Sequence, residues 1–213
     1  DVALFRMLGF DRIQAIDYSD YEQPDLIQDL NHPVGQELEN RFDSIFDLGT
    51  IEHIFDVRTV LRNIVRMLKV GGRAFHIAPS SNFVDHGYYS FSPVLFLDYY
   101  TVNGLEINAV ELLEMSTSEL TTPWRRYEYQ VGGHFSRGGL KSTRMWMTHI
   151  CVTKLAESTS EALPFQGAFE AHHRKGGLDE KERPVYAQYS ATPRRGALRA
   201  LARAVLPVGV RKF

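Results

Sequence analysis

The chain has 213 residues, of which 44% are hydrophobic and 23% are charged, and its formal net charge is −2 at pH 7. These values are typical of a soluble α/β domain with an appendage, and they give no overall bias toward a nucleic-acid or membrane partner. No apolar run approaches the roughly 18 residues that a membrane-spanning helix needs, and the amino end lacks a signal-peptide pattern.

The first predicted elements are a helix and two short strands. The chain opens at Asp1 directly in the amphipathic pattern DVALFRMLGF, without a preceding strand. A short strand is predicted at residues 12–17, which end in Asp17, and a second at residues 25–30. The polar residues 18–24 separate these two strands.

Residues 41–81 predict a strand, an acidic loop, an amphipathic helix and a second strand. The β-prone run at residues 44–48 is followed by Asp56, a residue suited to capping a helix. The glycine pair at residues 71–72 is predicted to end that helix, and residues 73–78 to form a parallel strand in a right-handed βαβ unit. The helix has one apolar face with i, i+3, i+4 spacing, made by Val57, Val60, Leu61, Ile64, Val65 and Leu68.

The second half of the chain predicts one helix and a closing pair of strands. The helix spans residues 93–103 and stops at Gly104, and the strands span residues 105–115 and 145–154. The bridge at residues 116–144 is rich in aromatic, basic and glycine residues. A loop of that length is typical of a functional lid or a disordered segment.

Cys151 is the only cysteine, so no intrachain disulfide is possible and a reduced, cytoplasmic setting is predicted. Residues 155–192 are mostly polar and predict a partly ordered extension. Residues 193–213 form a basic amphipathic segment in which every charged residue is Arg or Lys. Such a helix can lie on an anionic membrane, dock on a partner protein or pack on its own domain.

The order of these elements resembles the class I S-adenosylmethionine-dependent methyltransferases over residues 1–154. The resemblance rests on FDSIFDLGTIEH followed by a helix, RMLKVGG and the strand AFHIAPS, with IQAIDYSDYEQPDLIQDLNHPV as the second and third strands. It implies an α/β fold with a doubly wound, Rossmann-like sheet, mostly parallel with an antiparallel last strand. The family's first strand and glycine-rich loop would precede Asp1. Either the sequence is a fragment, or the chain lacks this loop and binds the cofactor poorly.

The resemblance implies S-adenosyl-L-methionine as the cofactor and assigns residues to it at three strand ends. Asp17 would take both ribose hydroxyls, since a carboxylate accepts two hydrogen bonds at once, and Tyr18 would pack on the adenine. Asp29 and the backbone of Leu30 would bind the adenine amino group. Ordinary turn chemistry is the alternative for the two aspartates. The loop after the fourth strand would meet the methionine part of the cofactor with Asp47, Gly49 and Thr50.

The segment after residue 81 carries polar and aromatic side chains that are predicted to face the methyl acceptor. His86 is the candidate catalytic base, because histidine has the unperturbed pKa best suited to a base near neutrality, and Asp85 would orient it. A solvated loop histidine is the alternative. Substrate-binding roles are predicted for Asn82, Tyr88, Tyr89 and His134.

Two other histidine-containing pairs stand out. Glu52 and His53 lie near the start of the next helix, where an acid favourably meets the helix dipole, and a direct part in catalysis is the second interpretation. His172 and His173 are adjacent and lack the i, i+4 spacing that places two ligands on one helix face. No metal site is therefore predicted.

The first functional hypothesis is methyl transfer to an oxygen or nitrogen of a small polar acceptor, such as a sugar or glycan precursor. The second is a non-catalytic methyltransferase-like domain that acts as a protein- or membrane-binding module. A third, a nicotinamide-dependent oxidoreductase, shares the acid after the second strand but is less compatible with the paired closing strands. A small-molecule acceptor is the expected partner, and no nucleic acid is expected.

Overall fold

The computed structural model describes residues 2–115, 124–131 and 142–166. The described residues fall into two compact units that divide between Asp29 and Leu30. The predicted methyltransferase-like domain of residues 1–154 therefore contains parts of two units, and each is described by itself.

The amino-terminal unit contains one helix and a parallel pair of strands. Its elements are α1 (Val2–Met7), β1 (Ile16–Asp17) and β2 (Leu26–Ile27). Both strands lie where the sequence predicts them, but each is only two residues long. Strand β1 ends at Asp17 as predicted, where a turn begins: Oδ1 of Asp17 accepts hydrogen bonds from the backbone N–H and the hydroxyl of Ser19.

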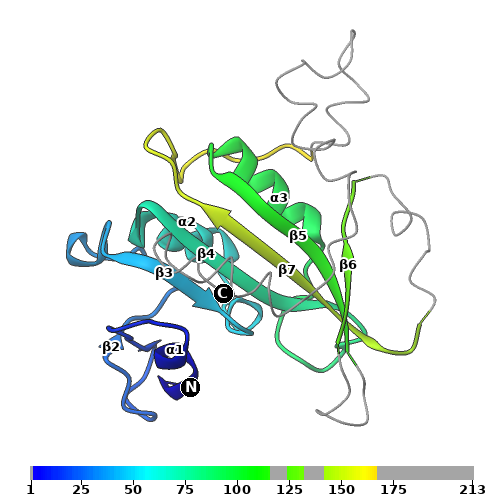
Figure 1. Ribbon diagram of the computed structural model, residues 1–213, viewed down its shortest axis with the longest axis horizontal. Coiled ribbons are helices and arrows are strands. Elements are labelled where there is room, and N and C mark those ends of the chain that lie inside the picture. The colour runs from blue at the N-terminus through cyan, green and yellow to red at the C-terminus, as the bar shows by residue number, and fades with distance from the viewer. Residues whose placement is uncertain (1, 116–123, 132–141, 167–213) are drawn as a thin grey trace, which may run out of the picture. The chain divides into compact units, whose positions relative to one another are not determined.

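The second unit is built on a five-stranded mixed sheet with the order β3-β4-β7-β5-β6 (Figure 1). Strands β3 and β4 pair in parallel, and β7 lies antiparallel between β4 and β5. The α/β class and the antiparallel last strand are therefore confirmed. The bounds are β3 (Phe42–Asp47), β4 (Leu68–Ser81), β5 (Glu106–Met115), β6 (Arg125–Glu128) and β7 (Met145–Thr153).

Strand β6 is the one described strand that the sequence did not predict. It lies inside the bridge of residues 116–144 and pairs antiparallel with β5 at the edge of the sheet. Its sequence, RRYE, lacks the alternating apolar pattern of a half-buried strand, so its pairing depends on the neighbouring strand.

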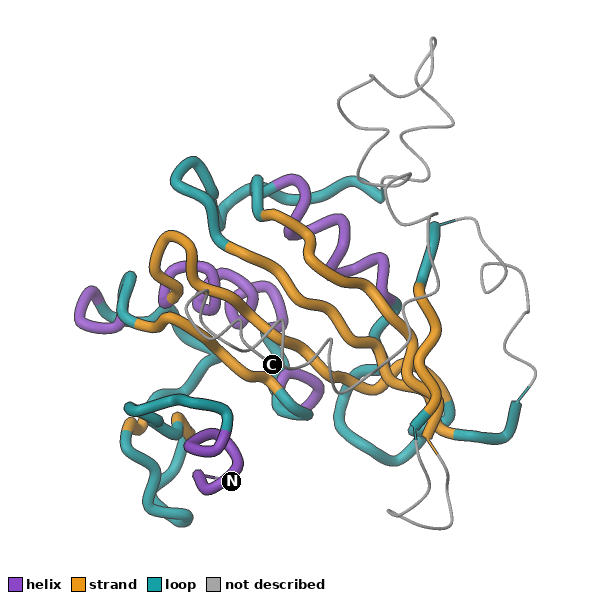
Figure 2. Tube along the Cα trace, in the orientation of Figure 1, coloured by secondary structure: helices purple, strands orange, loops and turns teal. Residues whose placement is uncertain are grey.

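The helices α2 and α3 and the 3₁₀ turn η2 pack with the sheet, and the structure has a further 3₁₀ turn, η1 (Figure 2). Asp56 caps the first helix as predicted: its carboxylate accepts from the N–H and the hydroxyl of Thr59 at 3.0 and 2.7 Å. These hydrogen bonds lower the pKa of Asp56. The second helix begins after Ser92 and ends one residue earlier than predicted. The bounds are η1 (Gln36–Leu38), η2 (Ile51–His53), α2 (Val57–Met67) and α3 (Pro93–Val102).

The glycine pair at residues 71–72 does not end the helix, which corrects the prediction. Helix α2 already stops at Met67, and both glycines lie inside β4. Gly71 has φ +81°, and a Cβ on Gly72 would lie 2.9–3.2 Å from backbone oxygens of Lys69, Phe42 and Asp43. Gly72 therefore serves a close approach of β4 to β3, and Gly71 supplies a positive φ inside the strand, so neither residue caps a helix.

Residues 155–166 continue beyond β7 and are held against α3. The Tyr99 hydroxyl donates to the carbonyl of Ser160, and the Asn103 amide donates to that of Ala162. Arg62 of α2 also pairs with Glu161. The start of the predicted polar extension is thus fixed by hydrogen bonds; the rest of it and the basic segment 193–213 lie outside the described residues.

Within the described ranges, no helix has the length and apolar character needed to cross a bilayer.

Candidate functional site

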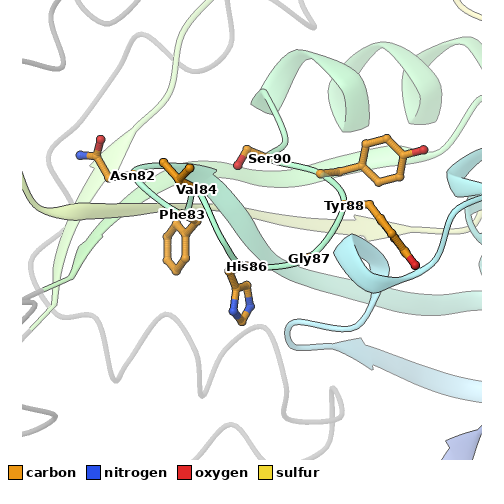
Figure 3. A pocket seen from close by; sticks show the side chains of 8 residues that line it. Asn82, Phe83, Val84, His86, Gly87, Tyr88 and Ser90 are labelled. Atoms are coloured by element: carbon orange, nitrogen blue, oxygen red, sulfur yellow. The ribbon is translucent and has the colours of Figure 1, made fainter.

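The candidate site lies where the chain leaves β3 and β4, at one edge of the parallel pair. After β3 the chain forms the short turn η2, and after β4 it forms the loop of residues 82–90. Ligands of open α/β sheets bind at this edge, because loops after parallel strands converge there. Residues 82–84 and 86–90 line an open hollow of about 170 Å³ on this loop (Figure 3).

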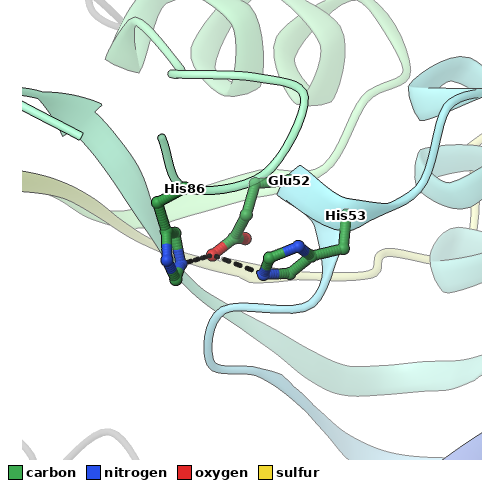
Figure 4. A group of neighbouring side chains, drawn as sticks. All are labelled: Glu52, His53 and His86. Carbon is green, nitrogen blue, oxygen red and sulfur yellow. Dashed lines mark ion pairs between the residues drawn. The ribbon is translucent and has the colours of Figure 1, made fainter. Parts of the chain in front are cut away.

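Glu52, His53 and His86 meet at this edge (Figure 4). Nε2 of His86 lies 3.3 Å from Oε1 of Glu52, and Nε2 of His53 lies 4.0 Å from the same oxygen. The two imidazole rings are 5.0 Å apart between centroids and nearly perpendicular. The Glu52 side chain is completely buried, whereas about half of each histidine is exposed. A buried acid is thus covered by two histidines that reach solvent.

The loop of residues 82–90 is fastened to η2 by its backbone. The N–H of Tyr88 donates to the carbonyl of Glu52 at 2.7 Å. Gly87, with φ +70°, allows this approach, because a Cβ there would lie 2.8 Å from the same carbonyl oxygen. The hydroxyl of Tyr89 donates to the carbonyl of Phe55 at 2.9 Å. These contacts bring His86 to Glu52 although 34 positions separate them in the sequence.

The pKa of Glu52 lies above its ordinary value, mainly because the side chain is buried. Burial raises the pKa of Glu52, the nearby Asp47 raises it further, and His53 and His86 lower it. Neither carboxylate oxygen of Glu52 has a hydrogen-bond partner among the described residues. A buried acid without such partners is costly for the fold, which favours a role beyond stability.

Asp47 was expected to form part of the cofactor wall, and the structure corrects this for its side chain. The carboxylate is buried, with Oδ2 2.6 Å from Nδ1 of His76. Its Oδ1 accepts the N–H groups of Thr50 and Ile51 at 3.0 and 3.1 Å. Nε2 of the fully buried His76 lies 2.6 Å from the Tyr100 hydroxyl. Asp47 therefore belongs to a core network that ties β3, β4 and α3 together.

The partner expected for His86 was Asp85, and this is also corrected. Asp85 is exposed and makes no hydrogen bond or ion pair among the described residues, while His86 faces Glu52. The contact that the structure gives His86 is with Glu52, so sequence adjacency did not identify its acidic neighbour. The sequence signal that could have identified the acidic neighbour of His86 was the Glu52–His53 pair in the turn after β3. This turn and the loop after β4 lie at the same edge of the sheet.

The remaining acceptor-side residues divide into structural and exposed groups. The Asn82 amide donates to the carbonyls of Ser142 and Arg144 at 2.9 and 2.6 Å, so it fastens the loop to the start of β7. Tyr88 is largely exposed and packs edge-on against Phe55. His134 lies outside the described residues. Of the predicted acceptor-side residues on this loop, Asn82, Asp85, His86 and Tyr88 are exposed, and Tyr89 is half-buried.

The cofactor residues of the amino-terminal unit lie at the ends of its strands. Asp17 closes β1 and Tyr18 follows it with a largely exposed ring. Asp29 is exposed two residues after β2. In the second unit, the backbone carbonyl of Leu30 accepts from Asn63, Gly49 has φ +98°, and Thr50 is exposed beside it.

Comparison with known proteins gives one family match and a remote structural likeness. Residues 10–76 match a family model described as a methyltransferase domain. No curated protein sequence matches the chain. The fold is similar to the crystal structure of the (4+2)-cyclase SpnF, with 14% sequence identity and a TM-score of 0.39, over 62% of this chain and 56% of that one. The chain thus spans little more than half the length of that protein.

Proposed function

We propose, from the premise that residues 10–76 belong to the class I S-adenosylmethionine-dependent methyltransferase family, that this protein methylates a small polar acceptor. The acceptor atom is an oxygen or nitrogen, with a sugar or glycan precursor as the favoured class. The observation that carries the proposal is the half-exposed His86 beside a buried carboxylate, at the edge where ligands of this fold bind.

In the amino-terminal unit, Asp17 and Tyr18 are the residues proposed to bind the donor. The exposed Tyr18 ring offers a stacking surface beside Asp17, and Oδ1 of Asp17 takes both hydrogen bonds from Ser19, which leaves Oδ2 to accept from a ribose hydroxyl. In the second unit, taken by itself, the family resemblance assigns Gly49 and Thr50 after β3 to the methionine part. When bound, S-adenosylmethionine supplies an electrophilic methyl group on a sulfonium.

His86 acts as the base that removes the acceptor's proton. Transfer to oxygen or nitrogen requires the nucleophile to be held in line with the methyl group and to lose its proton. The lone pair on His86 accepts that proton, and the Glu52 carboxylate, 3.3 Å away, stabilises the resulting imidazolium. Glu52 takes the orienting place that the sequence assigned to Asp85.

The chain is expected to bind S-adenosylmethionine and S-adenosylhomocysteine but not NAD in calorimetric titration. Asp17→Ala should weaken the binding of both sulfur compounds by roughly 1.5–3 kcal/mol, the range of charge-assisted hydrogen bonds. Asp20→Ala, an exposed acid in the same segment, serves as the matched control and should leave affinity unchanged. Absence of binding to both compounds would contradict methyl transfer and favour the non-catalytic binding module.

His86→Ala is expected to lower turnover by roughly 10²- to 10⁴-fold, the contribution of a positioned general base, with donor affinity unchanged. Release of S-adenosylhomocysteine is measured with a panel of monosaccharides and sugar nucleotides as acceptors. His149→Ala is the control, because it removes a histidine that also faces a carboxylate, Glu111, at 3.0 Å. Wild-type turnover by His86→Ala would return this residue to the role of a solvated loop histidine.

A further inference from the structure

We propose that Glu52, His53 and His86 form a binding site for a divalent transition-metal ion of the zinc type. The sequence predicted no metal site, because the third ligand comes from a loop 33 positions beyond His53. The inference goes beyond methyl transfer and does not depend on it.

The geometry suits such an ion. One potential ligand atom from each of the three residues lies within 4.8 Å of the other two. Zinc binds imidazole nitrogen and carboxylate oxygen at about 2.0–2.2 Å, so tetrahedral ligand atoms are roughly 3.4 Å apart. The 3.3 Å separation of His86 and Glu52 already matches this value, and the 4.0 Å separation of His53 and Glu52 closes with a small ring movement.

The buried acid supplies a second, independent argument. Both oxygens of the Glu52 carboxylate lack hydrogen-bond partners among the described residues, although the side chain is completely buried and faces the two imidazoles. Asp47 adds negative charge beside it. A bound cation would satisfy Glu52 and offset this concentration of negative charge.

The donor set also indicates the kind of ion and leaves a position open. Two imidazoles and one carboxylate form the three-ligand set of catalytic zinc sites, in which the fourth position holds water or another ligand. Magnesium and calcium prefer sets made of oxygen alone. Both histidines are half exposed, so the fourth position faces solvent. A ligated His86 has no free lone pair at Nε2, so the metal competes with the proposed base.

The test is calorimetric titration of the full chain with Zn²⁺ and, separately, with Mg²⁺, in the absence of any methyl donor. We expect one tight zinc site and no magnesium binding at the same concentrations. His53→Ala, His86→Ala and Glu52→Gln should each lower zinc affinity at least about tenfold, since even outer-shell changes at metal sites cost 10- to 100-fold. His149→Ala is the matched control and should retain wild-type affinity.

The two histidine substitutions lie at half-exposed positions, so circular dichroism should show an unchanged fold. Zinc binding of wild-type strength in both variants would place the ion on other histidines and overturn the proposal, as would absence of zinc binding in the wild type. Because no methyl donor is present, either result is separate from the failure of methyl transfer. Loss of affinity in all three variants but not in His149→Ala supports the site.

Discussion

Replacing His76 by alanine is expected to lower the free energy of unfolding by about 3–5 kcal/mol. His76 is fully buried, with Nδ1 2.6 Å from Asp47 and Nε2 2.6 Å from the Tyr100 hydroxyl. The alanine leaves a cavity beside Phe96, whose ring centroid lies 4.8 Å from that of His76. It also leaves the buried Asp47 carboxylate without its imidazole partner. The cavity and the lost partner of Asp47 both lower the free energy of unfolding.

Urea unfolding monitored by tryptophan fluorescence measures this effect, because the buried Trp146 lies in β7 of the same unit. Tyr100→Phe tests the network separately: it keeps the ring and removes one hydrogen bond, so the expected loss is about 1–3 kcal/mol. Burial raises the pKa of Tyr100, so its hydroxyl stays protonated and can donate to His76. A loss below about 1 kcal/mol for His76→Ala would show that the network does not hold the sheet to α3.

Gly87→Ala is expected to release the loop of residues 82–90 from η2. An alanine at this position would have to adopt φ near +70°, which costs about 1–2 kcal/mol. Its Cβ would also lie 2.8 Å from the carbonyl oxygen of Glu52. Because that contact is with backbone, the loop must move as a whole. Chymotrypsin cleavage after Tyr88 or Tyr89, followed by mass spectrometry, should then be about tenfold faster.

Gly71→Ala is the matched control for this substitution. Gly71 has a similar backbone conformation, with φ +81°, but a Cβ there would meet no atom within 4 Å. Gly71→Ala therefore introduces the strain of a positive φ but no steric clash. Cleavage in the loop of residues 82–90 should stay at the wild-type rate. Equal cleavage rates in the two variants would mean that Gly87 does not fasten the loop.

The elements with a clear period were predictable from the sequence. The apolar stripe of α2 and its cap at Asp56 lie as predicted, and α3, β5 and β7 begin and end within one residue of their predicted bounds. Periodicity and capping are local, so they do not depend on the neighbours of an element. Strand β6 shows the opposite case, because its pairing with β5 is what makes RRYE a strand.

The predictions that failed depended on how neighbouring strands and loops pack against one another. The glycine pair at residues 71–72 carried the signature of a helix end, but it lies inside β4, where Gly72 makes a close backbone contact with β3. Asp47 was placed correctly at the end of β3, yet its side chain turns into the core toward His76. Asp85 precedes the loop histidine, but the carboxylate that contacts His86 belongs to Glu52. The position of a residue in the sequence indicates which element it belongs to. The contacts of its side chain depend on the tertiary packing around it.

The sequence by itself determined the α/β class, the βαβ order of residues 41–81 and the edge of the sheet at which polar side chains gather, because these follow from local patterns and from the handedness of parallel connections. Only the tertiary structure decided which of those side chains meet. Glu52 and His86 come together because Gly87 lets the loop after β4 approach η2, and Tyr88 fixes it there through one backbone hydrogen bond. Such a contact depends on the spacing of two strands in the sheet, which no local pattern records.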